Sequence, residues 1–119
     1  MPTDNTKRPT NIHKLYHAHM YFDEATHELA ARLRQRIQQD FSVRVGRLHT
    51  DLVGPHPMWS CQIVFDATQF DALIPWLDAE REGLSVLVHA VTGDDYLDHT
   101  AYVYWLGQSV PLNVAFFDS

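Results

Sequence analysis

The hydrophobic and polar positions of this chain follow two different periods, one typical of strands and the other typical of helices. Alternation with period two, or a dense run of β-branched and aromatic residues, predicts four strands at residues 15–22, 42–49, 58–65 and 84–91. Apolar residues spaced by three or four positions predict two helices, at residues 23–40 and 66–82. The predicted order is therefore strand, helix, strand, strand, helix, strand.

Local signals mark where these elements end or are interrupted. Gly83 is placed to end the second helix, because glycine tolerates the left-handed conformation that follows many helices. Pro75 lies inside that helix, which predicts either a kink or two short helices that meet there. Gly46 either weakens the prediction of the second strand or marks a bulge in it.

The order of elements is that of a ferredoxin-like α+β sandwich, a four-stranded antiparallel sheet with both helices on one face. Strand 15–22 should then be central, with strand 84–91 on one side and strand 58–65 on the other. The helices should cover the face that carries the apolar row of each strand.

Two parts of the chain lie outside this motif. After the fourth strand we expect a helical or mixed segment at 94–106, although residues 102–105 also suit a strand, and then an extra C-terminal strand at 112–117. Residues 1–13 are polar and lack periodicity, which predicts a flexible N-terminal arm in front of a single domain at 14–119.

Histidine is out of proportion, since eight of the 119 residues are histidine and they form no tag-like run. His17 and His19 alternate along the central strand, so both should project from the face that the helices leave open. Antiparallel pairing with strand 84–91 brings His89 near His17, and His99 could fold back over the same end. Because histidine is the commonest metal ligand, the sequence predicts a metal site at His17, His19 and His89. The alternative is that these side chains are partly buried, hydrogen-bonded structure.

The remaining histidines are less easily placed. His49 and His56 belong near the other end of the central strand, so they reach the cluster only by loop folding or from a partner chain. His56 lies between two prolines, which is typical of a rigid turn and also indicates a fixed position. His13 and His27 are expected to be exposed to solvent. Cys61 lies on the apolar face of its strand and is expected to be a small buried hydrophobe.

Aromatic side chains gather in the extra segment, where they could wall a pocket for a planar ligand, cover the open face of the sheet or form a dimer contact. They are Tyr96, Tyr102, Tyr104 and Trp105. An uncovered sheet face bearing Leu15, Leu87 and Val91 would be an unusual apolar patch for a monomer. A homodimer is therefore the simplest expectation.

The composition narrows the classes of partner and compartment. Nine Lys and Arg against fifteen Asp and Glu give a net charge of −6, which argues against binding to nucleic acid or to an anionic membrane. No apolar run approaches the about 20 residues that span a bilayer, and the first residues lack the apolar core of a signal peptide, so we expect a cytoplasmic protein. The single cysteine excludes an internal disulfide and any multi-cysteine metal site.

Several short motifs follow one another along the chain. They are YHAHMYF at 16–22, GPHP at 54–57, PWL at 75–77, LSVLVH at 84–89, TGDD at 92–95, DHT at 98–100, WLG at 105–107 and PL at 111–112. Together they resemble the DOPA 4,5-dioxygenase family, and the similarity covers residues 15–117. Ala90 departs from the expected pattern, because we expect the family to carry proline after His89.

The resemblance implies a small, dimeric enzyme that uses non-haem iron(II) and O₂ for extradiol cleavage of a catechol such as L-DOPA. It also implies that the C-terminal strand lies beside the fourth strand. On this hypothesis His17, His19 and His89 are the Fe(II) ligands. A carboxylate from Asp94 or Asp98 is the alternative third ligand.

The same hypothesis assigns the other three histidines. His56 and His99 would do the acid–base work on the catechol, and His49 would orient another group by a hydrogen bond. Two other classes of protein stay open. One is a cofactor-free or haem-handling oxygenase of the dimeric ferredoxin-like type, and the other is a dimeric ferredoxin-like protein that binds a metal or small ligand without ring cleavage.

Overall fold

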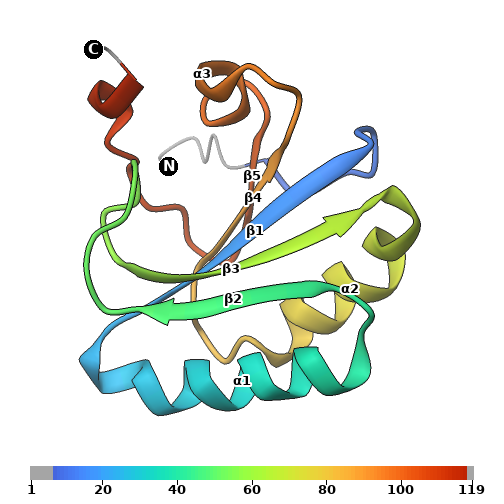
Figure 1. Cartoon of the computed structure of the whole chain (residues 1–119), viewed down its shortest axis with the longest axis vertical. Coiled ribbons are helices and arrows are strands. Elements are labelled where there is room, and N and C mark those ends of the chain that lie inside the picture. Colours follow the sequence, from blue (N-terminus) through green and yellow to red (C-terminus); the bar gives the residue numbers. More distant parts are fainter. Residues whose placement is uncertain (1–6, 118–119) are drawn as a thin grey trace, which may run out of the picture.

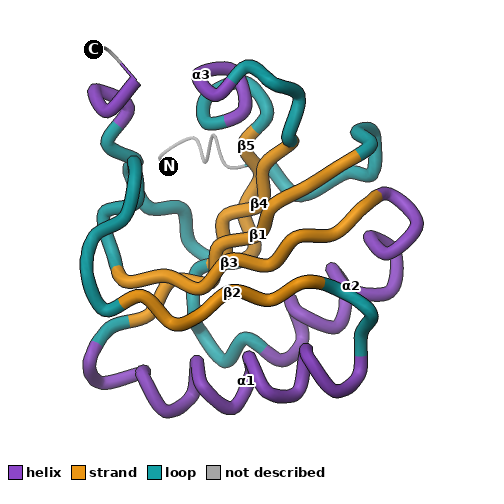
Figure 2. The backbone as a smooth tube through the Cα atoms, in the orientation of Figure 1, coloured by secondary structure: helices purple, strands orange, loops and turns teal. Residues whose placement is uncertain are grey.

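Five antiparallel strands form one sheet, and two long helices cover one of its faces (Figures 1 and 2). The computed structural model describes residues 7–117. The strands are β1 (Leu15–Phe22), β2 (Arg44–His49), β3 (Trp59–Asp66), β4 (Val86–Ala90) and β5 (Val103–Leu106). The helices are η1 (Glu24–Thr26), α1 (His27–Asp40), α2 (Ala67–Glu80), α3 (Asp95–Asp98) and η2 (Val114–Phe117). The sheet order is β2-β3-β1-β4-β5, which confirms the ferredoxin-like α+β fold with an added strand.

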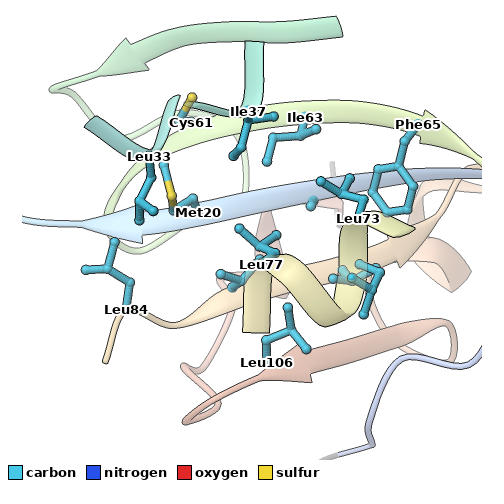
Figure 3. Close-up of a cluster of buried hydrophobic side chains, with 14 of the residues drawn as sticks. Met20, Leu33, Ile37, Cys61, Ile63, Phe65, Leu73, Leu77, Leu84 and Leu106 are labelled. Carbon is cyan, nitrogen blue, oxygen red and sulfur yellow. The ribbon is translucent and has the colours of Figure 1, made fainter. Parts of the chain in front are cut away.

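Alternation along the strands sends one row of side chains into a core between the sheet and the helices (Figure 3). In β1 this row is Tyr16, Ala18, Met20 and Phe22. Leu33 and Ile37 of α1 and Leu73 and Leu77 of α2 meet it from the helix side. Because this face takes the apolar row, the alternate side chains of β1 must face away from the helices.

Cys61 belongs to this core, as predicted. Its side chain is fully buried, and burial raises the pKa of the thiol to about 11. The thiol donates a long hydrogen bond of 3.5 Å to the carbonyl oxygen of Gly46. The residue is therefore a packed thiol rather than a nucleophile.

Asp66 fixes the point at which β3 turns into α2. Its carboxylate accepts hydrogen bonds from the backbone N–H groups of Thr68 (2.9 Å) and Gln69 (3.2 Å). The Gln69 side-chain oxygen in turn accepts from the Asp66 backbone N–H at 2.9 Å. This reciprocal capping box satisfies donors that the first turn of a helix leaves free.

The extra strand lies earlier in the chain than the expected range of 112–117. β5 occupies Val103–Leu106 and pairs with the free edge of β4, with Val86 opposite Leu106 and His89 opposite Val103. Tyr104 packs into the core between the sheet and the helices, whereas Trp105 packs on the opposite face of the sheet. This alternation is typical of a strand. Residues 112–117 instead form a loop and the short helix η2. The strand does lie beside β4, as the family resemblance implied.

Two predicted irregularities have different outcomes. The pairing of β2 with β3 shifts register between Val45 and Leu48, so the strand is irregular around Gly46, as a bulge there would make it. The alternative of two short helices at Pro75 is wrong, because α2 continues as one helix through this proline. The apolar row of the helix continues on both sides of Pro75, from Leu73 to Leu77, and packing of that row offsets the lost backbone hydrogen bond.

The N-terminal segment packs against the domain from residue 7 onward. The Trp105 backbone N–H donates to the carbonyl oxygen of Lys7 at 2.8 Å, and the Asn11 side chain donates to the carbonyl of Ala67 at 3.0 Å. Arg8 forms an ion pair with Asp78 at 2.6 Å. Residues 7–13 hold no helix or strand, and residues 1–6 of the predicted arm lie outside the described residues. Flexibility of the arm stays a prediction.

The open face of the sheet is covered at one end by the chain itself. Tyr21, Leu87 and Trp105 form a second buried cluster, against which Val110 and Leu112 pack. The exposed patch expected at Leu15, Leu87 and Val91 is therefore incomplete, because Leu87 is fully buried. Within residues 7–117 no helix is long and apolar enough to cross a membrane.

Leu77 tests the core that supports the sheet. Its side chain is fully buried, so Leu77→Ala should lower the free energy of unfolding by about 2–5 kcal/mol through lost burial and a residual cavity. Urea denaturation of the metal-free protein measures this change. Leu52→Ala is the matched control, because Leu52 is 66% exposed and its loss should cost no more than about 0.5 kcal/mol. Equal effects of the two substitutions would contradict the proposed core.

Candidate metal centre

Three histidines meet on the open face of the sheet because β1 and β4 pair in one register. His17 lies directly opposite His89, and His19 is two residues further along β1. Each of the three offers one ring nitrogen, and these three nitrogens lie within 4.8 Å of one another. The residues His17, His19 and His89, here called the metal triad, could therefore hold a metal ion.

One distance within the metal triad fits shared coordination. The Nε2 atoms of His19 and His89 are 3.0 Å apart. Two nitrogens that each bind one ion at about 2.1 Å, at roughly a right angle, are also about 3.0 Å apart. In the described residues, no carboxylate joins this group.

His89 also has the hydrogen bond expected of a metal-binding histidine. Its Nδ1–H donates to the carbonyl oxygen of Ala90 at 2.7 Å, which leaves the Nε2 lone pair directed at the site. The backbone N–H of Ala90 donates to the carbonyl of Tyr102 at 3.2 Å. Proline, which we expect the family to carry here, could not make this second bond, but its carbonyl could still accept from His89.

Burial keeps the metal triad neutral, which is the form that binds metal. Burial lowers the pKa of His19 well below its ordinary value, and the neighbouring His56 and His89 lower it further. Burial likewise lowers the pKa of His89 to about 3. The pKa of His17 is lowered by burial and then by His99, while Asp98 opposes the shift.

His56 reaches the metal triad through the folding of its own loop. Pro55 is buried beside it, and the His56 backbone N–H donates to the carbonyl of Val53 at 3.2 Å, which closes a turn. The ring centroid of His56 lies 4.1 Å from that of His19. Burial, followed by the charges of His99 and His49, lowers the pKa of His56 to about 4. No partner chain is needed to bring it there.

His99 approaches from the segment that follows β4, as the sequence indicated. Its ring centroid lies 4.2 Å from that of His89 and 6.2 Å from that of His56. The Nδ1–H donates to the carbonyl oxygen of Asp95 at 2.8 Å, so Nε2 keeps its lone pair. His56 and His99 therefore flank the metal triad, and these five residues are called the histidine cluster.

The other candidates lie outside the metal triad. His49 ends β2 opposite Ser60 and does not line the cavity of the histidine cluster. Asp94 caps α3 by accepting from the Leu97 backbone N–H at 3.0 Å. Asp98 is buried, and its two carboxylate oxygens accept from the backbone N–H and hydroxyl of Thr92 at 2.9 and 2.7 Å.

Two expectations about the remaining histidines are wrong, because both side chains are half-buried rather than exposed. His13 packs against the rings of Tyr102 and Tyr104, and its Nε2 lies 2.7 Å from the hydroxyl of Tyr104. His27 packs its ring edge against Phe22, with centroids 5.6 Å apart.

A cavity of about 250 Å³ opens over the histidine cluster. Its walls include residues that the sequence did not single out, among them Gln62, Phe116 and Phe117. The Phe117 ring lies 4.9 Å from that of His99. Hollows of about 260, 280 and 430 Å³ lie elsewhere; His49 lines the first of them, and no histidine lines the other two. The cavity over the histidine cluster is thus smaller than these hollows, and it has imidazole rings at its floor and partly aromatic walls.

The sequence profile of the Dopa 4,5-dioxygenase family matches residues 16–116, which include the whole histidine cluster. This chain belongs to that family. The DOPA 4,5-dioxygenase of Amanita muscaria is 36% identical over 111 residues, and the match covers 86% of this chain and 49% of that protein. An uncharacterized 21.2 kDa protein of Botryotinia fuckeliana is 32% identical over 118 residues, covering 89% of this chain and 64% of the relative.

A solved structure extends the likeness to three dimensions. The crystal structure of a proposed dioxygenase from Nostoc punctiforme is 43% identical in sequence and superposes with a TM-score of 0.86. The match covers 94% of this chain and 97% of that one. The chain therefore spans about half to two thirds of the two fungal relatives but nearly all of the cyanobacterial protein.

His17→Ala tests the metal triad directly. Removal of this ligand should weaken metal binding by more than the roughly 10–100-fold that loss of an outer hydrogen-bonding partner costs. Elemental analysis of protein purified without chelator, followed by titration with Fe²⁺ under argon, measures the effect. His13→Ala is the matched control, since His13 lies outside the histidine cluster, and it should bind metal normally. Unchanged metal content in His17→Ala would rule out the ligand role.

Acid should destabilise the metal-free protein through the same residues. Between the ordinary histidine pKa of 6.5 and the lowered values of about 4 for His56 and about 3 for His89, the unfolded chain binds protons that the folded chain does not. The free energy of unfolding should therefore fall as the pH is lowered from about 6.5 toward about 4. Urea midpoints measured in chelator at about pH 7.5 and about pH 5 report this change, and carboxylates stay ionised over that window. His56→Asn should show a smaller loss, and equal midpoints at the two pH values would contradict the prediction.

Proposed function

We propose that this protein is a non-haem iron(II)-dependent extradiol dioxygenase that cleaves the ring of a catechol such as L-DOPA. The observation that carries the proposal is the metal triad of neutral imidazoles at the floor of a cavity, with a further histidine on either side. Membership of the Dopa 4,5-dioxygenase family supports the same reaction class. The fold alone would not support a particular reaction class, because the same fold occurs in proteins with many different activities.

The donor set of the metal triad suits iron(II). Imidazole nitrogen is a ligand that iron, zinc and copper accept, and three protein ligands leave other coordination positions open. Iron(II), when bound, would bring the two catechol oxygens and O₂ together and let electrons pass between them. His17, His19 and His89 would hold the ion, and His89 is already oriented by its bond to Ala90.

The two flanking histidines are the proposed acid–base residues. His56 and His99 line the same cavity with their ring centroids 6.2 Å apart, so one bound substrate can reach both. Both are placed to exchange protons with catechol hydroxyl groups. His49 lies outside the cavity, and in the proposal it keeps the supporting role of orienting another group by a hydrogen bond.

The cavity walls suit a planar aromatic substrate. Phe116 and Phe117 of η2 present rings to the cavity, and Val91 adds an apolar surface. The loop that carries His56 is tied to this wall, because the Asn113 backbone N–H donates to the carbonyl oxygen of Pro55 at 2.9 Å. The proposed substrate would thus lie between η2 and the sheet.

A homodimer and a cytoplasmic location complete the proposal. Leu15, Val114 and Phe116 stay between 37% and 55% exposed, which supports contact with a second copy of the chain. The single cysteine is an unpaired thiol, which suits a reducing compartment.

The proposal is tested by turnover of a catechol panel in air after anaerobic loading with Fe²⁺. Iron-loaded protein should consume O₂ and yield a yellow ring-opened semialdehyde, whereas protein loaded with Zn²⁺ should do neither. His89→Ala should lose the activity and His13→Ala should keep it. Metal binding without product from any catechol would favour the non-catalytic binding protein. Turnover that persists in chelator would favour the cofactor-free oxygenase, and turnover that requires added haem would favour the haem-handling type.

A further inference from the structure

Tyr21 is a buried residue that the acid–base scheme leaves without a role. It shares the open face of β1 with His17 and His19, and only 1% of it is exposed. Leu87 and Trp105 pack around its ring in the second buried cluster. Its hydroxyl oxygen lies 2.7 Å from Nδ1 of His56.

The direction of this hydrogen bond follows from the surroundings of the hydroxyl. Among residues 7–117, His56 Nδ1 is the one polar atom within hydrogen-bonding distance of it. A tyrosine hydroxyl ordinarily titrates at about pH 10, so near neutral pH the proton stays on the oxygen. A buried O–H with a single partner must donate to that partner, because the alternative leaves its proton without an acceptor. Nδ1 of His56 is therefore the acceptor, and the proton of the neutral ring lies on Nε2.

The opposite edge of the His56 ring faces the cavity. Tyr21 does not line the cavity of the histidine cluster, whereas His56 does. Since Nδ1 is directed at Tyr21, the edge that carries Nε2 is turned toward the cavity side. His56 thus presents an N–H donor there.

His89 and His99 have the reverse arrangement. Each donates Nδ1–H to a backbone carbonyl, of Ala90 at 2.7 Å and of Asp95 at 2.8 Å. Both therefore keep a lone pair on Nε2. The cavity is flanked by one histidine that donates and one that accepts, although the two side chains are chemically identical.

We infer that Tyr21 is a positioning residue that fixes His56 as the hydrogen-bond donor of the cavity, while His99 is the acceptor. His99 Nε2 then takes the hydrogen bond from a catechol hydroxyl, and His56 Nε2–H donates one to an oxygen of the substrate or of O₂. In the proposed acid–base pair His56 is then the acid and His99 the base. The catalytic consequence rests on the proposed dioxygenase function, whereas the protonation of the His56 ring does not.

Tyr104 supplies a matched control on the other face of the sheet. It is also a buried tyrosine, and its hydroxyl lies 2.7 Å from a ring nitrogen of His13, which is outside the histidine cluster. Tyr104→Phe and Tyr21→Phe therefore remove the same group, at the same distance from an imidazole, at two separate places. A general loss of stability should appear in both variants.

The first experiment reads the position of the proton by ¹⁵N NMR of the imidazole rings in metal-free protein near neutral pH. His56, assigned with the His56→Asn variant, should carry its proton on Nε2, whereas His89 and His99 should carry theirs on Nδ1. Tyr21→Phe should abolish the preference of the His56 ring proton for Nε2 and leave the signals of His13 unchanged. Tyr104→Phe should change the signals of His13 and leave those of His56 unchanged. A wild-type His56 with its proton on Nδ1 overturns the inference, even if Tyr21→Phe fails to fold.

The second experiment measures turnover by iron-loaded variants. Tyr21→Phe should lower kcat by about 10–100-fold, as loss of an orienting hydrogen bond does elsewhere, with iron content unchanged. KM should change by less than about threefold, because substrate binding is left intact. Tyr104→Phe should stay within about twofold of wild type in kcat.

A double variant separates positioning from structural damage. Tyr21→Phe should cost nothing further in a His56→Asn background, because the residue to be positioned is gone. Additive losses, or an unchanged kcat in Tyr21→Phe, overturn the inference. Wild-type protein that turns over no catechol overturns the proposed function instead, and the NMR experiment still decides the Tyr21–His56 pair.

Discussion

The pairing of β1 with β4 is the constraint on which the rest of the site depends. Backbone bonds continue this pairing at both ends, from Val91 to Leu15 and from Tyr21 to Ser85. In this register His17 and His89 are direct neighbours. A slip of one residue would turn every side chain of the strand to the other face, placing imidazoles in the core and Tyr16 at the surface. The apolar core therefore specifies the register, and the register assembles the metal triad.

Crowding several imidazoles together conflicts with their usual chemistry in water. Burial and mutual repulsion oppose a second proton on His19, His56 and His89, so near neutral pH each of these three rings keeps one lone pair rather than a positive charge. Such an arrangement is costly unless something with positive charge is shared among the rings or N–H donors face the lone pairs. Hydrogen bonds decide which nitrogen of each ring carries the proton and which keeps the lone pair. Backbone carbonyls do this for His89 and His99, and the hydroxyl of Tyr21 does it for His56.

The parts of the molecule that were predictable from sequence are those governed by short-range pattern. Period-two alternation places His17 and His19 on one face, and antiparallel pairing then brings His89 beside them without any knowledge of loops. The position of His56 was not predictable in this way, because it depends on how a proline-flanked loop closes against Tyr21. That contact joins residues far apart in sequence.

The misplaced fifth strand has a related cause. The run at 102–106 is aromatic and β-branched and fits a strand, yet its position after a short helix also fits a longer helical segment. The free edge of β4 decides between them, because Val103–Leu106 satisfies the exposed backbone groups of that edge. Propensity within the segment carries no information about such an edge.

The N-terminal segment gives the sheet a protected border. The carbonyl oxygen of Lys7 accepts a hydrogen bond from the backbone N–H of Trp105. Without Lys7 this N–H would be unpaired on the outer side of β5. Unprotected edges of this kind invite another chain to add a strand. The ring of Trp105 also packs against that of Tyr21. Removal of the chain through Lys7 would therefore expose a strand edge that can pair with another molecule, and it would also loosen the packing behind the cavity. Removal of the N-terminal segment would thus affect both the solubility of the protein and the packing behind the cavity.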